Sequence, residues 1–271
     1  MRKSENPELH TFSVCAYGES PYLEKCILSL LNQTIKSEII ITTSTPNMHI
    51  KRIAEQYNIK LYCNQRQGEG IAQDWNYAYR TAHTELITIA HQDDIYLPQY
   101  AEQIIHHFQK DRTAIILFTD YAELRDEIQV TRNRILSVKR TMLRPLRYQW
   151  LQKRIWMRRR ILSLGNPICC PSVTYVKSKL PDVLFETGFQ SNIDWQAYEK
   201  ISRQKGSFHY CDQILMCHRI HEESTTTEII ESGRRKQEDL EMLYRFWPSY
   251  LARLVNHFYN AGEKSNKVQV K

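Results

Sequence analysis

Residues 86–98 have the sequence LITIAHQDDIYLP, in which an apolar run rich in β-branched residues ends at two adjacent acids, Asp93 and Asp94. Such a run predicts a buried strand, and open α/β sheets bind ligands at the carboxyl ends of their strands. Two neighbouring carboxylates repel each other unless a cation or a hydrogen-bond donor neutralises them, and their oxygens suit Mg²⁺ or Mn²⁺ shared with a diphosphate. The alternative is a polar turn that caps the helix following Pro98.

Strands and helices alternate on both sides of this stretch over roughly the first 120 residues. Apolar runs predict strands at 11–16, 38–43, 59–63 and 114–119, and helical spacing predicts helices at 21–31, 47–57, 71–82 and around Ile104, Ile105 and Phe108. We expect Ser20 to be the N-cap of the first helix and Pro21 its first residue. The alternation predicts an α/β fold with a doubly wound, mostly parallel, Rossmann-like sheet. The sequence contains neither the G-x-G-x-x-G fingerprint nor a P-loop.

The composition is that of an ordinary folded protein, with 271 residues of which 42% are hydrophobic and 25% charged. This length suffices for one domain with an appendage. The polar N-terminus has no apolar h-region, so no signal peptide is predicted, and no apolar run is long enough to span a bilayer. The seven cysteines contain no C-x-x-C pair, which predicts free thiols in a reducing cytosol.

Positive charge is concentrated in one part of the chain. The net charge is +7, yet the segment from Ile128 to Pro181 holds 13 Lys and Arg and no Asp or Glu. Within residues 132–160 the cations alternate with apolar and aromatic residues such as Trp150 and Trp156. Three interpretations compete: a solvated helix pair covering the sheet, a surface that contacts an anionic membrane, and a nucleic-acid surface. Nucleic acid is disfavoured, because the acid pair after residue 92 would repel phosphodiesters and no nucleic-acid module is recognisable.

Taken together, several short motifs resemble the nucleotide-sugar-binding half of family 2 glycosyltransferases. The motifs are Ala16-Tyr17-Gly18 after a strand, Ser29-Leu30-Leu31-Asn32-Gln33-Thr34 in the first helix, the strand EIIITT, Trp75-Asn76 in a helix, and the strand ending HQDD. The resemblance covers about Phe12 to His221 and implies the GT-A fold. It also implies a set of nucleotide-sugar-binding residues: Ala16, Tyr17, Glu19, Thr43, Asn76, His91, Gln92 and Arg219.

The acidic motifs of the family are only partly matched. The family usually has Asp-Asp-Gly-Ser after the second strand, where an acid contacts the base, whereas this chain has Thr42-Thr43-Ser44-Thr45. The first acid of the family's Asp-x-Asp motif is replaced by His91. Asp93 matches the acid that holds the metal. The resemblance therefore implies an Mn²⁺ or Mg²⁺ site made by Asp93, Asp94 and His221.

Two motifs in the second half extend the resemblance. Asn192-Ile193-Asp194-Trp195 is similar to the family's Glu-Asp-Trp element, whose Asp is the general base. The alternative for Asp194 is a helix cap, and the two roles are compatible. Residues 214–226 resemble the family's closing Tyr-Arg-x-His-x-x-Ser segment. This match implies that Arg219 pairs with diphosphate oxygens and that His221 approaches the metal or a phosphate.

The resemblance implies an inverting glycosyltransferase that uses a nucleotide-diphosphate sugar, with a UDP-sugar as the expected donor. We expect a GT-A domain at 1–227, with its nucleotide-sugar half at about 10–120 and its acceptor half at 121–227. Residues 228–271 are expected to form a helical extension with two helices split by Pro248 and a frayed tail from Gly262.

The expected acceptor is a bacterial surface glycan or a lipid-linked acceptor. The expected location is the cytoplasm, peripherally at the inner face of the plasma membrane through residues 132–160. No oligomeric state is predicted. Two alternatives stay open: a metal-dependent nucleotidyltransferase, and an inactive binding protein with a GT-A-like fold.

Overall fold

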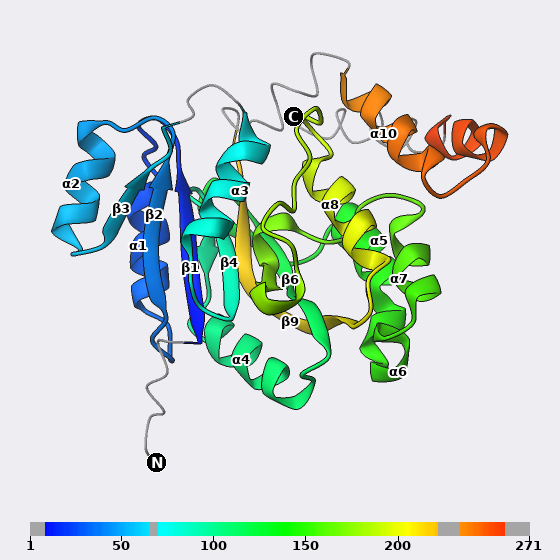
Figure 1. Cartoon of the computed structure of the whole chain (residues 1–271), viewed down its shortest axis with the longest axis horizontal. Coiled ribbons are helices and arrows are strands. Elements are labelled where there is room, and N and C mark those ends of the chain that lie inside the picture. The colour runs from blue at the N-terminus through cyan, green and yellow to red at the C-terminus, as the bar shows by residue number, and fades with distance from the viewer. Residues whose placement is uncertain (1–8, 66–69, 222–233, 258–271) are drawn as a thin grey trace.

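The computed structural model describes residues 9–65, 70–221 and 234–257, and within them one curled sheet carries helices on both faces (Figure 1). The elements in the first half are β1 (His10–Ala16), α1 (Leu23–Leu31), β2 (Glu38–Thr43), α2 (Met48–Gln56), β3 (Lys60–Cys63), α3 (Ile71–Thr81), β4 (Leu86–His91), β5 (Ile95–Tyr96) and α4 (Tyr100–Lys110). The elements in the second half are β6 (Ala114–Arg125), β7 (Ile128–Val130), α5 (Arg134–Leu143), α6 (Gln149–Gln152), α7 (Ile155–Leu162), β8 (Val173–Val176), α8 (Ile193–Ser202), β9 (Ser207–Ile220) and α10 (Arg234–Tyr244).

The strands are hydrogen-bonded in the order β3-β2-β1-β4-β8-β6-β9-β5, and β7 pairs with β6. β1 is parallel to both β2 and β4, and β2 is parallel to β3, whereas β8 runs antiparallel to its neighbours β4 and β6. The register pairs Ala16 with Thr43 and Cys15 with His91. The carboxyl ends of β1, β2 and β4 therefore meet at one edge, where open α/β sheets bind ligands.

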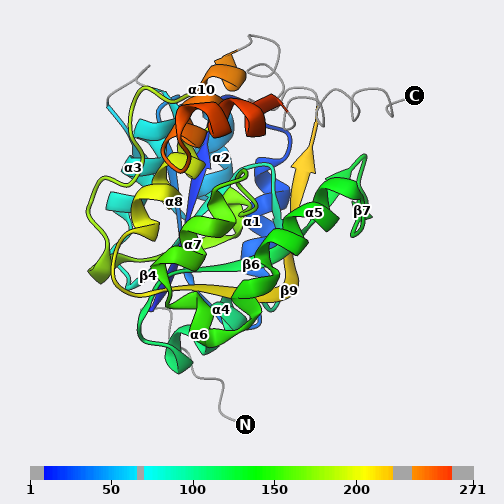
Figure 2. The same cartoon turned by 90° about the vertical axis from the view of Figure 1, so that its right-hand side faces the viewer.

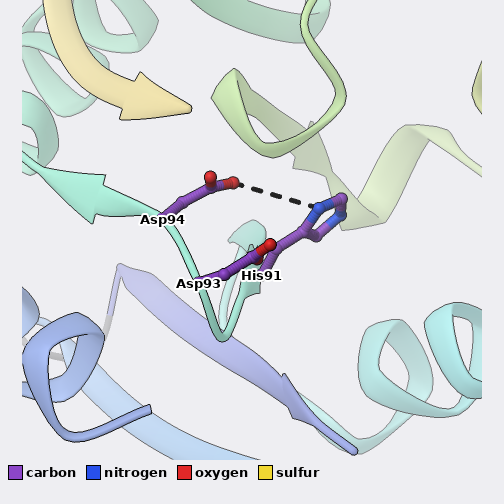
Figure 3. A group of neighbouring side chains, drawn as sticks. All are labelled: His91, Asp93 and Asp94. Atoms are coloured by element: carbon purple, nitrogen blue, oxygen red, sulfur yellow. Dashed lines mark ion pairs between the residues drawn. The ribbon is translucent and has the colours of Figure 1, made fainter. Parts of the chain in front are cut away.

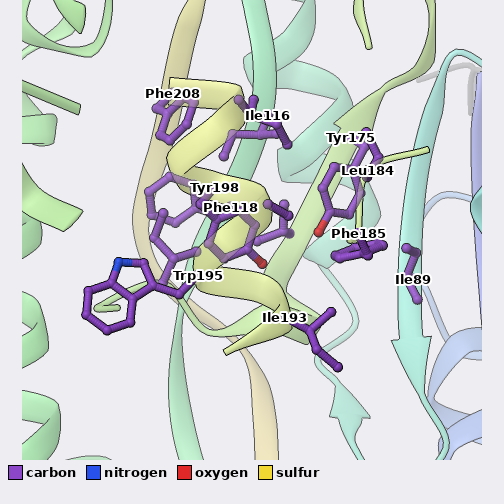
Figure 4. Packing of buried hydrophobic residues seen from close by; sticks show 14 of the residues in the cluster. Ile89, Ile116, Phe118, Tyr175, Leu184, Phe185, Ile193, Trp195, Tyr198 and Phe208 are labelled. Atoms are coloured by element: carbon purple, nitrogen blue, oxygen red, sulfur yellow. The ribbon is translucent and has the colours of Figure 1, made fainter. Parts of the chain in front are cut away.

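Alternate residues of the strands supply two apolar cores, one on each face of the sheet. One core contains Phe12 and Val14 of β1 together with the apolar sides of α1, α2 and α4. The other contains Ile89 and Tyr175 with the buried sides of α3, α7 and α8, and part of it is drawn in Figure 4. Because helices cover both faces, the predicted doubly wound α/β fold is confirmed.

The structure corrects the predicted start of the first helix. α1 begins at Leu23 with Tyr22 as its N-cap, so the prediction of Ser20 as the cap and Pro21 as the first helical residue is wrong. The Ser20 hydroxyl accepts a hydrogen bond from the Tyr22 amide at 3.2 Å, which closes a local turn before the helix starts. At α2, in contrast, the Asn47 side chain caps the helix by accepting from the Ile50 amide at 2.9 Å.

The basic stretch, residues 132–160, contains α5 and α6 and most of α7, and of these helices α7 packs beside α8 (Figure 2). Acids from other elements neutralise several of its cations: Arg140 pairs with Asp120, Arg147 with Asp212, Lys153 with Asp111 and Arg159 with Glu199. Arg158 is fully buried and donates to the carbonyls of Gln204 and Gly206. Mutual repulsion within the stretch is therefore partly relieved by the fold itself.

The described C-terminal part is helical. α10 is followed, after Pro248, by a second helical stretch at 249–257, and Trp247 Nε1 donates to the Ser163 carbonyl at 2.6 Å, which attaches this part to α7. The predicted residues 228–233 of this extension, its tail from Gly262 and the end of the 214–226 motif lie outside the described residues. No helix within the described ranges is long and apolar enough to cross a membrane. All seven cysteines are free thiols.

Candidate active site

The turn after β4 gathers His91, Asp93 and Asp94 in one cluster (Figure 3). One ligand atom of each residue lies within 4.8 Å of those of the other two, and His91 Nδ1 lies 4.0 Å from Asp94 Oδ2. Asp94 is fully buried, while the Asp93 side chain is 21% exposed. The cluster therefore has a buried carboxylate at its base and a more accessible one at its rim.

The end of β9 brings three further side chains to this cluster. Asp94 Oδ1 accepts from the Arg219 amide and from His218 Nδ1, both at 2.9 Å, and His221 Nε2 donates to Asp93 Oδ2 at 3.0 Å. Burial lowers the pKa of His218, but the attraction of Asp94 outweighs it and raises that pKa above the ordinary value. Burial likewise opposes ionisation of Asp93, yet the His221 hydrogen bond leaves the Asp93 pKa lowered. His218 was not predicted as a site residue.

The donor atoms of this cluster fit a divalent cation. Asp94 Oδ2 is buried and has no hydrogen-bond partner among the described residues, which is costly unless a ligand takes up its lone pairs, and His91 Nδ1 faces it at 4.0 Å. Burial lowers the pKa of His91 and so favours the neutral ring, the form that ligates metals. Carboxylate oxygens with imidazole nitrogen suit Mn²⁺, and carboxylates alone suit Mg²⁺.

Arg219 is bound on several sides by the protein. Its Nε donates to the Asp93 carbonyl at 2.9 Å, one terminal nitrogen donates to Glu127 at 2.6 Å, and the guanidinium lies 4.4 Å from the centre of the Tyr22 ring. The other terminal nitrogen is buried without a hydrogen-bond partner among the described residues. Arg219 therefore braces the turn that carries Asp93, and the terminal nitrogen without a described partner is the one that its bonds to the protein leave for the expected diphosphate contact.

The turn after β1 is held by Gln92. The Gln92 amide accepts from the Tyr17 amide at 2.9 Å and donates to the Tyr17 carbonyl at 3.0 Å. Gly18 has a φ of +60°, which favours glycine, and its amide donates to Thr45 Oγ1. Tyr17 is 64% exposed at the edge of the sheet, which leaves its ring available to a ligand. Gln92 thus orders the turn and does not project away from it.

The other residues expected to bind the nucleotide sugar divide into exposed and buried ones. Glu19 is exposed, whereas Ala16 and Thr43 are buried at the strand ends, and Thr43 Oγ1 accepts from the Thr45 amide at 3.0 Å. Asn76 is 2% exposed, and its amide bonds the backbone of Leu184 and Phe185. The structure thus places Asn76 as an anchor of the loop before α8.

A carboxylate missed by the sequence reasoning lies beside the end of β2. Asp74 of α3 accepts from Ser44 Oγ at 2.7 Å and from Asn64 Nδ2 at 3.2 Å. The next residue, Trp75 of the predicted Trp75-Asn76 motif, stacks on the His91 ring with the ring centres 5.0 Å apart. The absence of acids at residues 42–45 therefore does not leave this edge without a carboxylate. The only sequence signal was that Asp74 precedes Trp75 in the first turn of α3.

Asp194 lies in the first turn of α8, and its carboxylate is held at both oxygens. Oδ1 accepts from the Trp195 amide and Oδ2 from Asn166 Nδ2, both at 2.7 Å. Burial raises the pKa of Asp194 to about 6, although the Trp195 hydrogen bond and the Lys139 charge oppose this rise. A carboxyl with a pKa near the working pH exchanges protons readily. The formal N-cap is Asn192, so Asp194 does not cap α8 in the strict sense.

The raised pKa of Asp194 should be visible in the pH dependence of the free energy of unfolding. The pKa of an Asp in the unfolded chain is about 3.9, so the folded protein binds the Asp194 proton more tightly, and the stabilising effect is lost as pH rises through about 6. An Asn at this position cannot ionise. The difference in unfolding free energy between Asp194→Asn and wild type should therefore shift in favour of the variant by roughly 2–3 kcal/mol between pH 4 and pH 8. Urea titrations at several pH values measure it, and a constant difference would contradict the prediction.

Comparison with known proteins identifies relatives in sequence and in structure. The model of glycosyl transferase family 2 matches residues 11–179. An uncharacterised glycosyltransferase of Rickettsia typhi is 24% identical over 259 residues, covering 94% of this chain and 75% of that protein. Residues 1–349 of S. aureus TarS, solved in complex with UDP-GlcNAc, superpose with a TM-score of 0.63 at 13% identity, covering 97% of this chain and 76% of that one.

A second solved structure is similar to the same extent. The mannosyltransferase PcManGT of Pyrobaculum calidifontis, in complex with GDP-Man and Mn²⁺, has a TM-score of 0.61 at 16% identity. The match covers 94% of this chain and 72% of that one. At these identities the structural likeness shows a shared fold.

Proposed function

The chain belongs to glycosyl transferase family 2 and is a glycosyltransferase of the GT-A fold, and from this we propose that it moves a sugar from a nucleoside diphosphate sugar to an acceptor hydroxyl with inversion. The observation that carries the proposal is the cluster of His91, Asp93 and Asp94 at the carboxyl end of β4. This cluster lies at the edge where the exposed Tyr17 and the Asp74 carboxylate also lie.

The proposed donor is a UDP-sugar. TarS binds UDP-GlcNAc and PcManGT binds GDP-Man with Mn²⁺, and both share the fold of this chain. In this chain the turn at Tyr17, the end of β2 at Thr43 and the Asp74 carboxylate surround the sheet edge, where a base and ribose would be recognised. Glu19 belongs to the Tyr17 turn, Gln92 orders that turn, and Ala16 precedes it at the end of β1. Asn76 anchors the loop before α8, and the uracil base remains the expected one.

In the proposed mechanism, Asp93, Asp94, His91 and His221 would hold Mn²⁺ or Mg²⁺. Such an ion, when bound, supplies neutralisation of the negative charge that develops on the departing diphosphate. The residues around the cluster hold its two acids in place. His218 and the Arg219 amide fix the Asp94 carboxylate, and the Arg219 side chain fixes the turn that carries Asp93.

Asp194 is the proposed general base. The Asn166 amide and the Trp195 amide orient its carboxylate, and burial raises its pKa to about 6. Asp194 takes the proton of the acceptor hydroxyl as the oxygen forms its bond to the anomeric carbon. Attack in line with the departing diphosphate inverts the configuration at that carbon.

A thermal-shift screen tests the donor assignment. UDP-sugars with Mn²⁺ should raise the melting temperature more than the same sugars with a chelator, because a ligand that binds only the native state stabilises it. The product of turnover separates the alternatives: a glycosyltransferase releases the nucleoside diphosphate, whereas a nucleotidyltransferase releases pyrophosphate. Binding without any turnover would support the inactive binding protein.

The proposed acceptor is a surface glycan on a lipid carrier, reached at the inner face of the plasma membrane. After the ion pairs of the fold are accounted for, Arg154 and Arg160 remain exposed beside Trp156, which is 59% exposed. They line an open groove of about 750 Å³ between α7 and Trp247. Two arginines on either side of a tryptophan suit the anionic headgroup layer of a membrane. Each cation contributes about 1 kcal/mol to binding such a layer at low salt.

We expect the protein to sediment with phosphatidylglycerol vesicles at low salt and to be released by high salt. The variant Arg154→Gln/Arg160→Gln should lose this binding, and Arg158 stays unchanged because it is buried. A matched control is Lys36→Gln/Arg52→Gln, which removes the same charge from exposed positions outside the basic stretch. The proposed membrane contact would be contradicted if both variants lost vesicle binding equally, or if the wild-type protein did not sediment with the vesicles at low salt.

A further inference from the structure

Lys139 of α5 is joined to the acid cluster by a chain of side-chain contacts. Its Nζ donates to the Tyr121 hydroxyl at 3.1 Å and lies 5.3 Å from the centre of the Tyr121 ring. The Tyr121 ring in turn meets the His218 ring edge-on, with the ring centres 6.4 Å apart. His218 donates to Asp94. The Lys139 ammonium is thus linked to Asp94 through the Tyr121 and His218 rings.

The same ammonium acts on Asp194. The charge of Lys139 favours the ionised form of Asp194 and disfavours the charged form of His218, so it lies within electrostatic range of both. The adjacent cation is used differently, because Arg140 donates to Asp120 and to the carbonyls of Thr131 and Tyr121. Arg140 therefore holds α5 to β6, whereas the charge of Lys139 acts on His218 beside the acid cluster and on the proposed base, Asp194.

We propose that Lys139 binds the diphosphate of the nucleotide sugar and stabilises it as it departs, a role that rests on the proposed function. In the proposed mechanism the diphosphate lies at the acid cluster and the acceptor at Asp194, so the departing oxygen is on the cluster side of the sugar, where the Tyr121 and His218 rings link Lys139 to Asp94. A lysine ammonium is a compact charge with three N–H donors. The hydrogen bond that Lys139 donates to the Tyr121 hydroxyl orients it. Negative charge grows on the diphosphate only as the sugar bond breaks, so the contact strengthens in the transition state.

The experiment compares nucleoside diphosphates with monophosphates. Calorimetric titrations of UDP, UMP, GDP and GMP, each with Mn²⁺, are made with wild type, Lys139→Met, Lys139→Arg and Tyr121→Phe. Lys139→Met should weaken binding of the preferred diphosphate by about 10-fold to 100-fold, the size of a lost hydrogen bond to a charged group, and leave its monophosphate within about 2-fold. Lys139→Arg should recover much of the loss, and Tyr121→Phe should show a smaller loss of the same selectivity.

Transfer kinetics provide a second readout. Lys139→Met should lower kcat for the donor more than it raises KM, because the contact strengthens as charge develops. Equal weakening of diphosphate and monophosphate, or an unchanged diphosphate affinity, would overturn the role of Lys139. A wild-type protein that binds no nucleoside diphosphate would overturn the proposed function as well, so the two failures are distinguishable.

Discussion

Asp194→Asn is expected to lower the rate of sugar transfer by about 10²-fold to 10⁴-fold, the usual contribution of a general base, while leaving donor binding intact. The amide keeps the shape of the side chain and can accept the Trp195 hydrogen bond at 2.7 Å, but it cannot take a proton. Asp194 does not reach the nucleotide in the proposed mechanism, so the affinity for the donor should not change. Transfer rates at saturating donor and acceptor measure the effect.

The matched control is Asp182→Asn, which makes the same chemical change at an exposed position before α8. It should leave transfer within about 2-fold of wild type, as surface substitutions usually do. The wild-type rate should also fall as the pH drops below about 6, because protonated Asp194 cannot act as a base. Near-normal transfer by Asp194→Asn would reduce this residue to a structural element of the α8 terminus.

The sequence was sufficient to predict the parallel part of the sheet. Each of β1, β2 and β4 is a short apolar run followed by a helix with one apolar face, so local periodicity defines both elements, and their chain order restricts the topology. β5 was missed because two residues, Ile95 and Tyr96, carry no periodicity. β9 was missed because its 14 residues include the polar pair Asp212 and Gln213, and its pairing with β6 is a long-range contact.

The sequence predicted the site residues that lie close together in the chain. It did not predict the contacts that form between distant segments. His91, Asp93 and Asp94 follow one another in the sequence, so a single turn brings them together. The bond between His218 and Asp94 spans 124 residues, and nothing in either segment specifies it. The neutralisation of Arg140 and Lys153 could not be predicted for the same reason, because their acid partners come from β6 and from the end of α4.

Asp93→Asn is expected to abolish the stabilisation that Mn²⁺ adds to nucleotide binding. At a free ligand concentration 100-fold above Kd, this stabilisation is about 2.7 kcal/mol and should disappear in the variant. Asp93 is the more exposed acid of the cluster, and its carboxylate accepts a hydrogen bond from His221. An amide offers a divalent cation a neutral oxygen in place of a charged one, so affinity for the ion falls while the fold is retained.

Asp94→Asn is the informative comparison, because the two acids have different surroundings. Asp94 is fully buried, and its Oδ1 already accepts from His218 and from the Arg219 amide. An amide there removes the charge that raises the pKa of His218, so this variant should lose about 1–3 kcal/mol of stability even without metal, the cost of disrupting a buried charged hydrogen bond. Thermal unfolding of both variants, each with Mn²⁺ plus UDP and each with a chelator, separates the effects. Undiminished Mn²⁺-dependent stabilisation in Asp93→Asn would remove Asp93 from the metal site, and because Asp94 would then be the cluster's main anionic ligand, its variant should show the larger metal-dependent loss.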